Sequence, residues 1–264
     1  MIITSIKNVF SLKGKTVVVT GGNKGIGFGI AAAFAQAGAN VAIIARDESG
    51  GLSAISRLAG EYGGVFRFYR ADVTDMSGCR DSVNKIIEDY ARIDVLVNNA
   101  GTAPNGDLLD MDGDLSEYFK CIDIDLHGVV RMTYLAARHM RDRGKGGKII
   151  NISSNSAVMA NRLINLVPYC TAKAGVNQFT RAMALELAKY NIQINAIAPG
   201  YTWSEIMAAL DKTTIDGMAG VTPDGRLGAP LEVGALAVFL AGDAANHITG
   251  DIITIDGGHS LGIY

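Results

Sequence analysis

The sequence has few of the residues that hold metals and no long apolar segment. Its three cysteines are scattered without metal-ligand spacing, and its four histidines form no cluster, so no metal site is expected. Residues 1–10 include Lys7 and do not form a secretion signal, so the thiols are expected to be reduced in a cytoplasm. No apolar run approaches the ~18 residues of a membrane-spanning helix, and we expect a cytoplasmic protein that does not associate with a membrane.

An excess of charge of one sign is also lacking. The chain has 24 lysines and arginines against 26 aspartates and glutamates, a net charge of −2 and a pI of about 6.1. A basic surface for nucleic acid or for an anionic membrane is therefore not predicted.

The chain instead shows the alternation of an α/β protein. Its 264 residues are predicted to form a single domain over 1–264, with 1–11 as an N-terminal extension. Apolar runs of strand length alternate with helical periodicity, which predicts a mainly parallel sheet with helices on both faces and a ligand beyond the carboxyl ends of the strands. The expected strands are 17–19, 41–45, 65–69, 95–97, 148–152, 192–198 and 251–255, and later helices are expected at 77–90, 115–140, 168–189 and 231–240.

A glycine turn follows the first strand. Val17–Val19 is β-branched and continuous, and Gly21, Gly25 and Gly27 then precede a helical pattern that begins near Ile26. Such a turn lets backbone amides and the positive helix end reach a phosphate. The spacing is one residue longer than the dinucleotide fingerprint, and a plain tight turn is the alternative.

Two cations near the predicted ribose pocket bear on the choice of nucleotide. Ala45 stands where an acid would bind a ribose 2′-hydroxyl, Arg46 follows it, and Lys24 lies in the glycine turn. This pattern favours NADP(H). The alternative is that both cations are solvated, with Arg46 paired to Asp47 or Glu48.

The ends of the next strands supply further candidate contacts. Asp72 is placed to accept a hydrogen bond from adenine, and Asn99 to Gly101 are placed along the ribose, although the latter also fit a plain turn. The predicted cofactor contacts are Gly21, Asn23, Lys24, Gly25, Ile26, Gly27, Arg46, Asp72, Val73, Asn99, Ala100, Gly101, Tyr169, Lys173, Pro199, Gly200 and Thr202.

Tyr169 and Lys173 are candidates for acid–base chemistry. Four residues apart at the start of a predicted helix, they share one face. Tyrosine normally has a pKa of about 10, but a neighbouring ammonium favours the phenolate and allows proton exchange with a carbonyl or alcohol near neutral pH. An ordinary surface pair is the alternative.

The motifs together closely resemble the short-chain dehydrogenase/reductase family. They are Thr20-Gly-x-x-x-Gly25-x-Gly27, Asn98-Asn99-Ala100-Gly101, Ser153-Ser154 at a strand end, Tyr169-x-x-x-Lys173 and Pro199-Gly200, in this order. The resemblance runs from about Leu12 to Gly258. It implies a doubly wound, Rossmann-like fold with about seven parallel strands, a nicotinamide cofactor and a homotetramer.

The resemblance also implies roles for single residues. Tyr169 matches the family's proton donor, and Lys173 matches the lysine that activates this tyrosine and holds the nicotinamide ribose. Lys24 and Arg46 match positions that mark NADP(H)-preferring members.

Two positions depart from the family pattern. The catalytic serine, which orients the substrate oxygen, is Ser154 by alignment to the strand end, but Ser156 by the usual spacing of 13 residues before the tyrosine. We prefer Ser154, because a strand fixes position better than a loop. Asp125 stands where the family usually has an asparagine that holds a water linking the lysine to solvent; a carboxylate there could pair with Lys173 or stay protonated.

The substrate walls are expected at 155–167 and in an apolar flap at 200–226. Polar residues in the first wall favour a small hydroxylated substrate such as a sugar, polyol or keto acid: Asn155, Asn161, Arg162 and Asn165. The flap carries Trp203, Ile206, Met207, Leu210 and Met218, each of which could simply pack on the body. The leading hypothesis is a ketone–alcohol oxidoreductase. A 3-oxoacyl or hydroxysteroid reductase and a catalytically silent NADP(H)-binding sensor are the alternatives.

Overall fold

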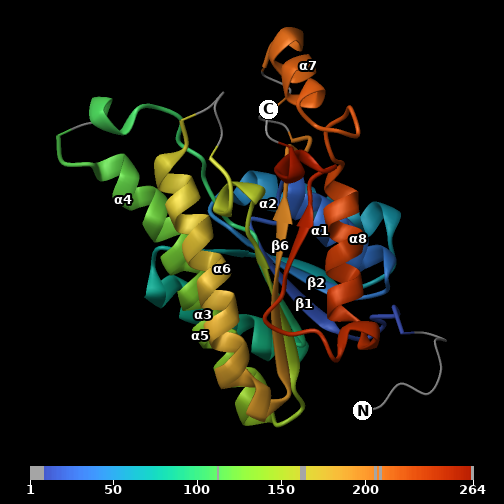
Figure 1. Ribbon diagram of the computed structural model, residues 1–264. Coiled ribbons are helices and arrows are strands. Elements are labelled where there is room, and N and C mark those ends of the chain that lie inside the picture. Colours follow the sequence, from blue (N-terminus) through green and yellow to red (C-terminus); the bar gives the residue numbers. More distant parts are fainter. Residues whose placement is uncertain (1–8, 112, 161–164, 205–206, 208–209, 263–264) are drawn as a thin grey trace.

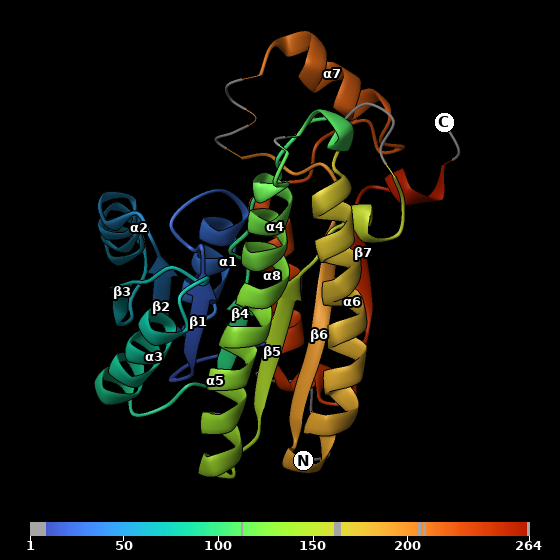
Figure 2. The ribbon, with the colours of Figure 1, turned by 90° about the vertical axis from the view of Figure 1, so that its left-hand side faces the viewer.

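The computed structural model describes residues 9–111, 113–160, 165–204, 207 and 210–262. Within them lies one parallel sheet in the order β3-β2-β1-β4-β5-β6-β7, covered by helices on both faces (Figures 1 and 2). This confirms the predicted doubly wound α/β fold. The strands are β1 (Thr16–Thr20), β2 (Asn40–Ala45), β3 (Phe66–Arg70), β4 (Val95–Asn98), β5 (Gly147–Ile152), β6 (Ile192–Pro199) and β7 (Ile252–Ile255).

The helices form two layers. On one face α1, α2 and α8 pack on side chains such as Val17 and Val19, and on the other α3, α5 and α6 pack on side chains such as Val18. This alternation is the two-residue period of a strand that is buried on both faces. The bounds are α1 (Gly25–Gln36), α2 (Glu48–Glu61), α3 (Met76–Tyr90), α4 (Ser116–Ile122), α5 (Gly128–Arg143), α6 (Val167–Leu187), α7 (Lys212–Gly220) and α8 (Pro230–Ala241). No helix in the described ranges is long and apolar enough to cross a membrane.

The strand order reverses between β1 and β4, which fixes where a ligand can bind. The hydroxyl of Thr20, at the end of β1, accepts the backbone N–H groups of Asn99 (2.9 Å) and Ala100 (3.0 Å), just beyond β4. These bonds tie the two strand ends together. The crevice at such a switch point is where open α/β sheets bind their ligands.

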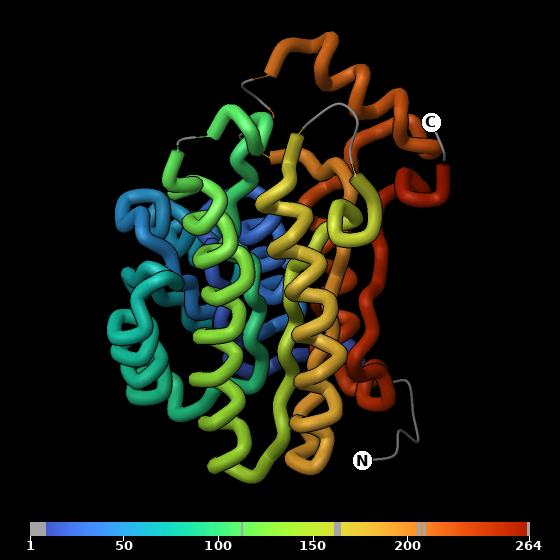
Figure 3. The backbone as a smooth tube through the Cα atoms, turned by 60° about the vertical axis from the view of Figure 1, so that its left-hand side comes forward, coloured from blue at the N-terminus to red at the C-terminus, as the bar shows by residue number. Residues whose placement is uncertain are grey.

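Three details differ from the sequence-based expectations. The single helix predicted at 115–140 is divided into α4 and α5 by a π-helical turn, Asp123–His127. The flap contains α7, which Figures 1 and 3 show above the carboxyl ends of the strands. Of the expected N-terminal extension, residues 1–8 lie outside the described part of the chain.

The small residues of the two long helices bear on the homotetramer, because small side chains allow close contact between helices. Ala136, Ala137 and Ala184 are buried in the core beneath α5 and α6, whereas Ala182 is exposed. The homotetramer stays a prediction of the family resemblance.

Helices α1 and α8 approach each other closely through glycines. A Cβ added at Gly234 would lie 2.7 Å from the Cβ of Ala33 and 2.7 Å from the carbonyl oxygen of Gly29. A Cβ at Gly29 would in turn lie 2.6 Å from the backbone carbon of Pro230. The helix that starts at the glycine turn is therefore held in place by backbone contact.

We predict that Gly234→Ala destabilises the protein, because the added methyl group must displace backbone atoms. Overpacking of this kind costs about 1–3 kcal/mol, which corresponds to a fall in Tm of roughly 2–12 °C for a chain of this size. Gly60→Ala is the matched control: Gly60 lies in α2 with open space around its Cβ position, and its replacement should raise Tm slightly. Equal effects of the two substitutions in a thermal melt would refute the close-packing argument.

Candidate active site

The glycine turn has a geometry that side chains would block. Gly21 and Gly25 adopt φ values of +64° and +54°, which glycine tolerates best. A Cβ at Gly27 would collide with the Gly21 carbonyl oxygen and the Asn99 amide. That amide braces the turn by donating to the carbonyl oxygens of Thr20 (3.0 Å) and Gly21 (3.2 Å). Backbone is thus left uncovered at the mouth of the crevice.

The N-terminus of α1 opens onto this turn. Lys24 is its N-cap residue but makes no capping hydrogen bond within the described chain, and the first turn has no acidic residue. The partial positive charge at this helix end is therefore not neutralised by a side chain of that turn. The site is suited to a phosphate group.

Arg46 follows β2 and is largely exposed. Its guanidinium lies 3.6 Å from Oδ2 of Asp72, at the end of β3. The alternative partners are engaged elsewhere: Asp47 caps α2, and Glu48 pairs with Arg70 at 3.5 Å. Arg46 therefore pairs at the crevice with Asp72 and not with its sequence neighbours Asp47 and Glu48.

A cavity of about 380 Å³ lies beside Arg46. Its wall combines the apolar side chains of Phe119 and Ile124 with the carboxylate of Asp72. Burial raises the pKa of Asp72, but hydrogen bonds from the Thr74 amide and hydroxyl and the Arg46 charge outweigh it, so the pKa lies below its usual value. The full lining is Arg46, Asp72, Thr74, Phe119, Lys120, Asp123 and Ile124.

Lys120 and Phe119 were not predicted from the sequence as site residues. They lie on α4, and only the tertiary fold brings them opposite the end of β3. Val73, which was predicted as a cofactor contact, is buried, and its carbonyl oxygen accepts a hydrogen bond from Arg131.

Asp125 is held inside the π-helical turn and is fully buried. Its Oδ1 accepts the backbone N–H of Thr102 at 2.8 Å. A Cβ at Gly101 would lie 2.8 Å from Oδ2, so glycine at that position leaves room for the carboxylate. A π-helical turn often marks a functional position in a helix.

Lys173 meets Asp125 in the interior. Its Nζ lies 3.2 Å from Oδ2 of Asp125 and donates to the carbonyl oxygen of Ile152 at 2.9 Å. Burial raises the pKa of Asp125 and opposes the positive charge of Lys173. For Lys173 the attraction of the negative Asp125 carboxylate outweighs the effect of burial, and the pKa of the lysine is raised above its usual value. The lysine is therefore a fixed cation at neutral pH.

Tyr169 lies one helical turn before Lys173 on α6, with the centre of its ring 5.5 Å from the lysine Nζ. The two side chains are brought together as the four-residue spacing predicts. Electrostatic coupling links them, because a negative charge on Tyr169 further raises the pKa of Lys173.

The two serines after β5 point to different partners. The Ser153 hydroxyl donates to Oδ1 of Asn177 on α6 at 2.6 Å. Ser154 is buried and accepts the backbone N–H of Ser156 at 3.1 Å. Within the hydrogen bonds of the described residues, its own hydroxyl hydrogen has no acceptor. Ser156 contributes its backbone to orienting Ser154.

The ends of β6 and β7 form another wall of the site. The Gly200 amide, directly after β6, donates to Ile255 at 3.0 Å, and the hydroxyl of Thr202 donates to Gly200 at 3.1 Å. These contacts join Pro199, Gly200 and Thr202 to the end of β7.

A turn near the C-terminus, which was not predicted from the sequence, completes this wall. The Asn155 amide lies 3.3 Å from both Oδ2 of Asp256 and Nδ1 of His259. The His259 ring stacks on Tyr201 with centroids 5.0 Å apart. The signal for this turn was Gly257-Gly258, both of which adopt positive φ.

The predicted substrate walls are only partly described. Asn161, Arg162 and Ile206 lie outside the described residues. Asn165 bonds to Asp107, and Met218 is buried, whereas Trp203 is 44% exposed and Leu210 37%. The end of the flap is anchored where Arg226 forms two bonds, of 2.8 and 2.9 Å, to Glu232 on α8.

Comparison with known proteins places this geometry in a family. A family model described as enoyl-(acyl carrier protein) reductase matches residues 21–260. The chain is 36% identical to a 3-oxoacyl-[acyl-carrier-protein] reductase, FabG, of Chlamydia muridarum, covering 94% of this chain and 98% of that protein. It is 34% identical to the sorbose reductase SOU1 of Candida albicans, covering 97% and 91%.

Solved structures agree. The crystal structure of a short-chain type dehydrogenase/reductase from Mycobacterium marinum superposes with a TM-score of 0.92 at 36% identity, covering 98% of this chain and all of that one. The chain belongs to the short-chain dehydrogenase/reductase family, whose members are oxidoreductases that act on CH–OH groups with a nicotinamide cofactor, NAD(P)(H).

Proposed function

We propose that this protein is an NADP(H)-dependent oxidoreductase that interconverts a ketone and a secondary alcohol. The observation that carries the proposal is the juxtaposition of Tyr169 with the buried cation Lys173, close to the end of β5, which Ser154 follows. When bound, the nicotinamide supplies or accepts the hydride.

The chain's own groups handle the proton and the oxygen. Ser154 donates its free hydroxyl hydrogen to the substrate oxygen and orients it. Tyr169 gives its proton to that oxygen during reduction and takes it back during oxidation. The charge of Lys173 favours the phenolate formed in between. Asp125 and the Ile152 carbonyl hold the lysine in place.

The residues at the crevice fit a dinucleotide with a 2′-phosphate. The uncovered glycine turn and the N-terminus of α1 suit the pyrophosphate. Arg46 can form a bidentate contact with the 2′-phosphate, and Lys24 adds a point charge. The adenine fits the cavity between Asp72 and Phe119.

For the substrate we propose a small hydroxylated ketone or its alcohol. The sorbose reductase of Candida albicans supports this choice by likeness. The second candidate is a 3-oxoacyl thioester, which the likeness to the chlamydial 3-oxoacyl-[acyl-carrier-protein] reductase favours.

We predict that the protein oxidises NADPH with a member of a panel of ketoses, diketones, keto acids and a 3-oxoacyl thioester, followed at 340 nm. Tyr169→Phe should lower kcat by about 10²–10⁴-fold while NADPH binding stays nearly unchanged. Tyr62→Phe removes only a hydroxyl that accepts from Gln36 near the end of α2 and serves as the tyrosine control, with kcat close to wild type. A silent panel together with tight NADPH binding would instead support a catalytically inactive NADPH sensor.

We predict that Arg46→Ala weakens NADPH and spares NADH. A charged hydrogen bond contributes roughly 1.5–3 kcal/mol, so the NADPH Kd should rise about 10- to 150-fold. NADH has no 2′-phosphate and should bind with a similar Kd. Arg70→Ala is the matched control, because Arg70 is exposed on the neighbouring strand and pairs with Glu48. Equal losses for both cofactors, or a wild type that prefers NADH, would contradict NADP(H) recognition by Arg46.

We predict that Asp125→Asn destabilises the protein, because it removes the carboxylate that pairs with the buried Lys173 cation. Breaking a buried ion pair by removing one partner costs about 3–5 kcal/mol. Asp123→Asn, in the same π-helical turn but paired with the partly exposed Arg131, is the matched control and should cost less. An equal fall in Tm for the two variants in a thermal melt would show that the buried pair does not stabilise the protein.

A further inference from the structure

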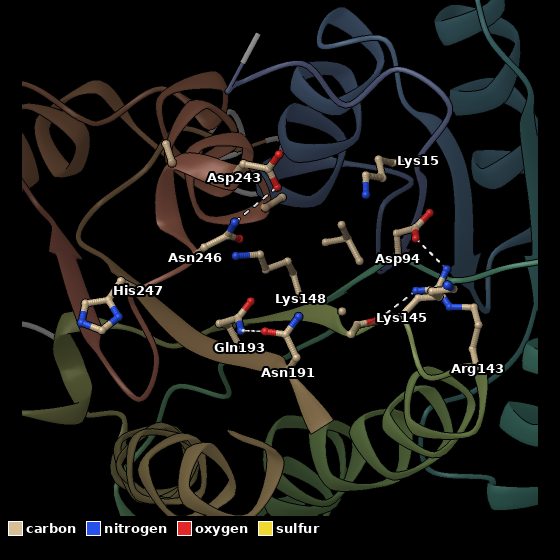
Figure 4. A pocket seen from close by; sticks show the side chains of 15 residues that line it. Lys15, Asp94, Arg143, Lys145, Lys148, Asn191, Gln193, Asp243, Asn246 and His247 are labelled. Atoms are coloured by element: carbon tan, nitrogen blue, oxygen red, sulfur yellow. Dashed lines mark hydrogen bonds and ion pairs between the residues drawn. The ribbon is translucent and has the colours of Figure 1, made fainter. Parts of the chain in front are cut away.

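A second cavity lies at the opposite edge of the sheet from the candidate active site. It has a volume of about 620 Å³ and is bounded by the amino ends of β1, β4, β5 and β6 and by the segment after α8 (Figure 4). Its lining is Lys15, Asp94, Val95, Arg143, Lys145, Gly146, Gly147, Lys148, Asn191, Gln193, Ala241, Asp243, Ala244, Asn246 and His247.

Lys148 is the feature of this cavity that calls for a ligand. It is the second residue of β5 and is only 8% exposed. Its Nζ is buried and has no hydrogen-bond partner within the described residues. Figure 4 shows the side chain extending among the polar residues of the lining. A buried ammonium group without an acceptor is costly, and such groups are normally paired or hydrogen-bonded.

The surrounding charges do not supply a partner. Asp94 is already shared by Arg92 and Arg143, the latter at 2.8 Å. Asp243 is exposed and acts on Lys148 only at a distance, while Lys15 adds repulsion. Burial lowers the pKa of Lys148 to about 8. In the described part of the chain, Lys15, Lys145 and Lys148 form no ion pair with a carboxylate.

We propose that this cavity binds a small anionic metabolite, whose phosphate or carboxylate oxygen accepts a hydrogen bond from Lys148. Lys15 and Lys145 add positive charge at the cavity wall. The side-chain amides of Asn246 and Gln193 donate one hydrogen each, to Asp243 at 3.5 Å and to Asn191 at 3.2 Å, and each keeps a second hydrogen for a ligand. An oxyanion provides the acceptor that Lys148 lacks and restores the charge that burial disfavours.

This site is separate from the dinucleotide crevice. Lys148 precedes Ser154 by six residues along β5 and its end, or about 20 Å at ~3.3 Å per residue. The volume of the cavity exceeds what a lone phosphate ion needs, so we expect the natural ligand to be a larger molecule that carries the anionic group. The inference does not depend on the proposed reaction.

The test compares wild type with Lys148→Met by calorimetric titration of inorganic phosphate and of citrate, with ionic strength held constant by chloride. Methionine keeps the length and removes the charge. We expect one probe or both to bind the wild type and to lose at least about 10-fold in affinity in Lys148→Met. Preference for phosphate would indicate a phosphorylated ligand, and preference for citrate a polycarboxylate.

Two controls keep the result interpretable. Lys13→Met removes an exposed lysine that does not line the cavity and should leave binding unchanged. Lys148→Met should melt at the same temperature as the wild type or higher without added anion, because an unpaired buried charge is gone. A phosphate ion at Arg46 would bind both proteins alike, so equal affinities of wild type and Lys148→Met, or no binding to either, overturn the proposal.

Discussion

The buried ion pair between Lys173 and Asp125 is the contact on which the catalytic half of the site depends. Two charges removed from water lose hydration that only good geometry returns. Here the lysine also donates to the Ile152 carbonyl, and the aspartate also accepts from the Thr102 amide. The pair thereby connects α6, the end of β5, the loop after β4 and the π-helical turn. Loss of either charge would leave the other buried without compensation.

The π-helical turn explains how this pair can form at all. A π-helical turn holds one residue more than a regular α-helical turn. The wider turn at Asp123–His127 therefore rotates the side-chain faces of α4 relative to those of α5. One face of the combined helix packs on the core through Met132 and Ala136, and Asp125 still points to Lys173. Gly101 completes the arrangement, because any side chain there would meet the carboxylate.

The fold was predictable because its signals are local. Val17–Val19 reads as a buried strand, the glycines after it read as a turn, and Tyr169 and Lys173 share a helix face by spacing alone. The partner of Arg46 was not predictable: sequence adjacency suggested Asp47 or Glu48, but Asp47 caps α2 and the tertiary fold supplies Asp72. The expected helix at 115–140 gave no sign of its π-helical turn, since one extra residue barely alters a helical pattern.

The places where cations line cavities follow from the sheet's architecture. Both faces of the parallel sheet are covered by helices, so ligands can approach the strands only at their two edges. At the carboxyl edge, Lys24 forms no ion pair within the described residues, and Arg46 lies 3.6 Å from Asp72, a carboxylate that also accepts two hydrogen bonds from Thr74. At the amino edge, Lys148 faces a cavity in which one lining carboxylate, Asp94, is taken by two arginines, and another, Asp243, acts on the lysine only at a distance. A chain with a net charge of −2 thus concentrates available positive charge at the two places where backbone and side-chain donors are also uncovered. The two anion sites that we propose therefore lie where the fold leaves cations available to a ligand.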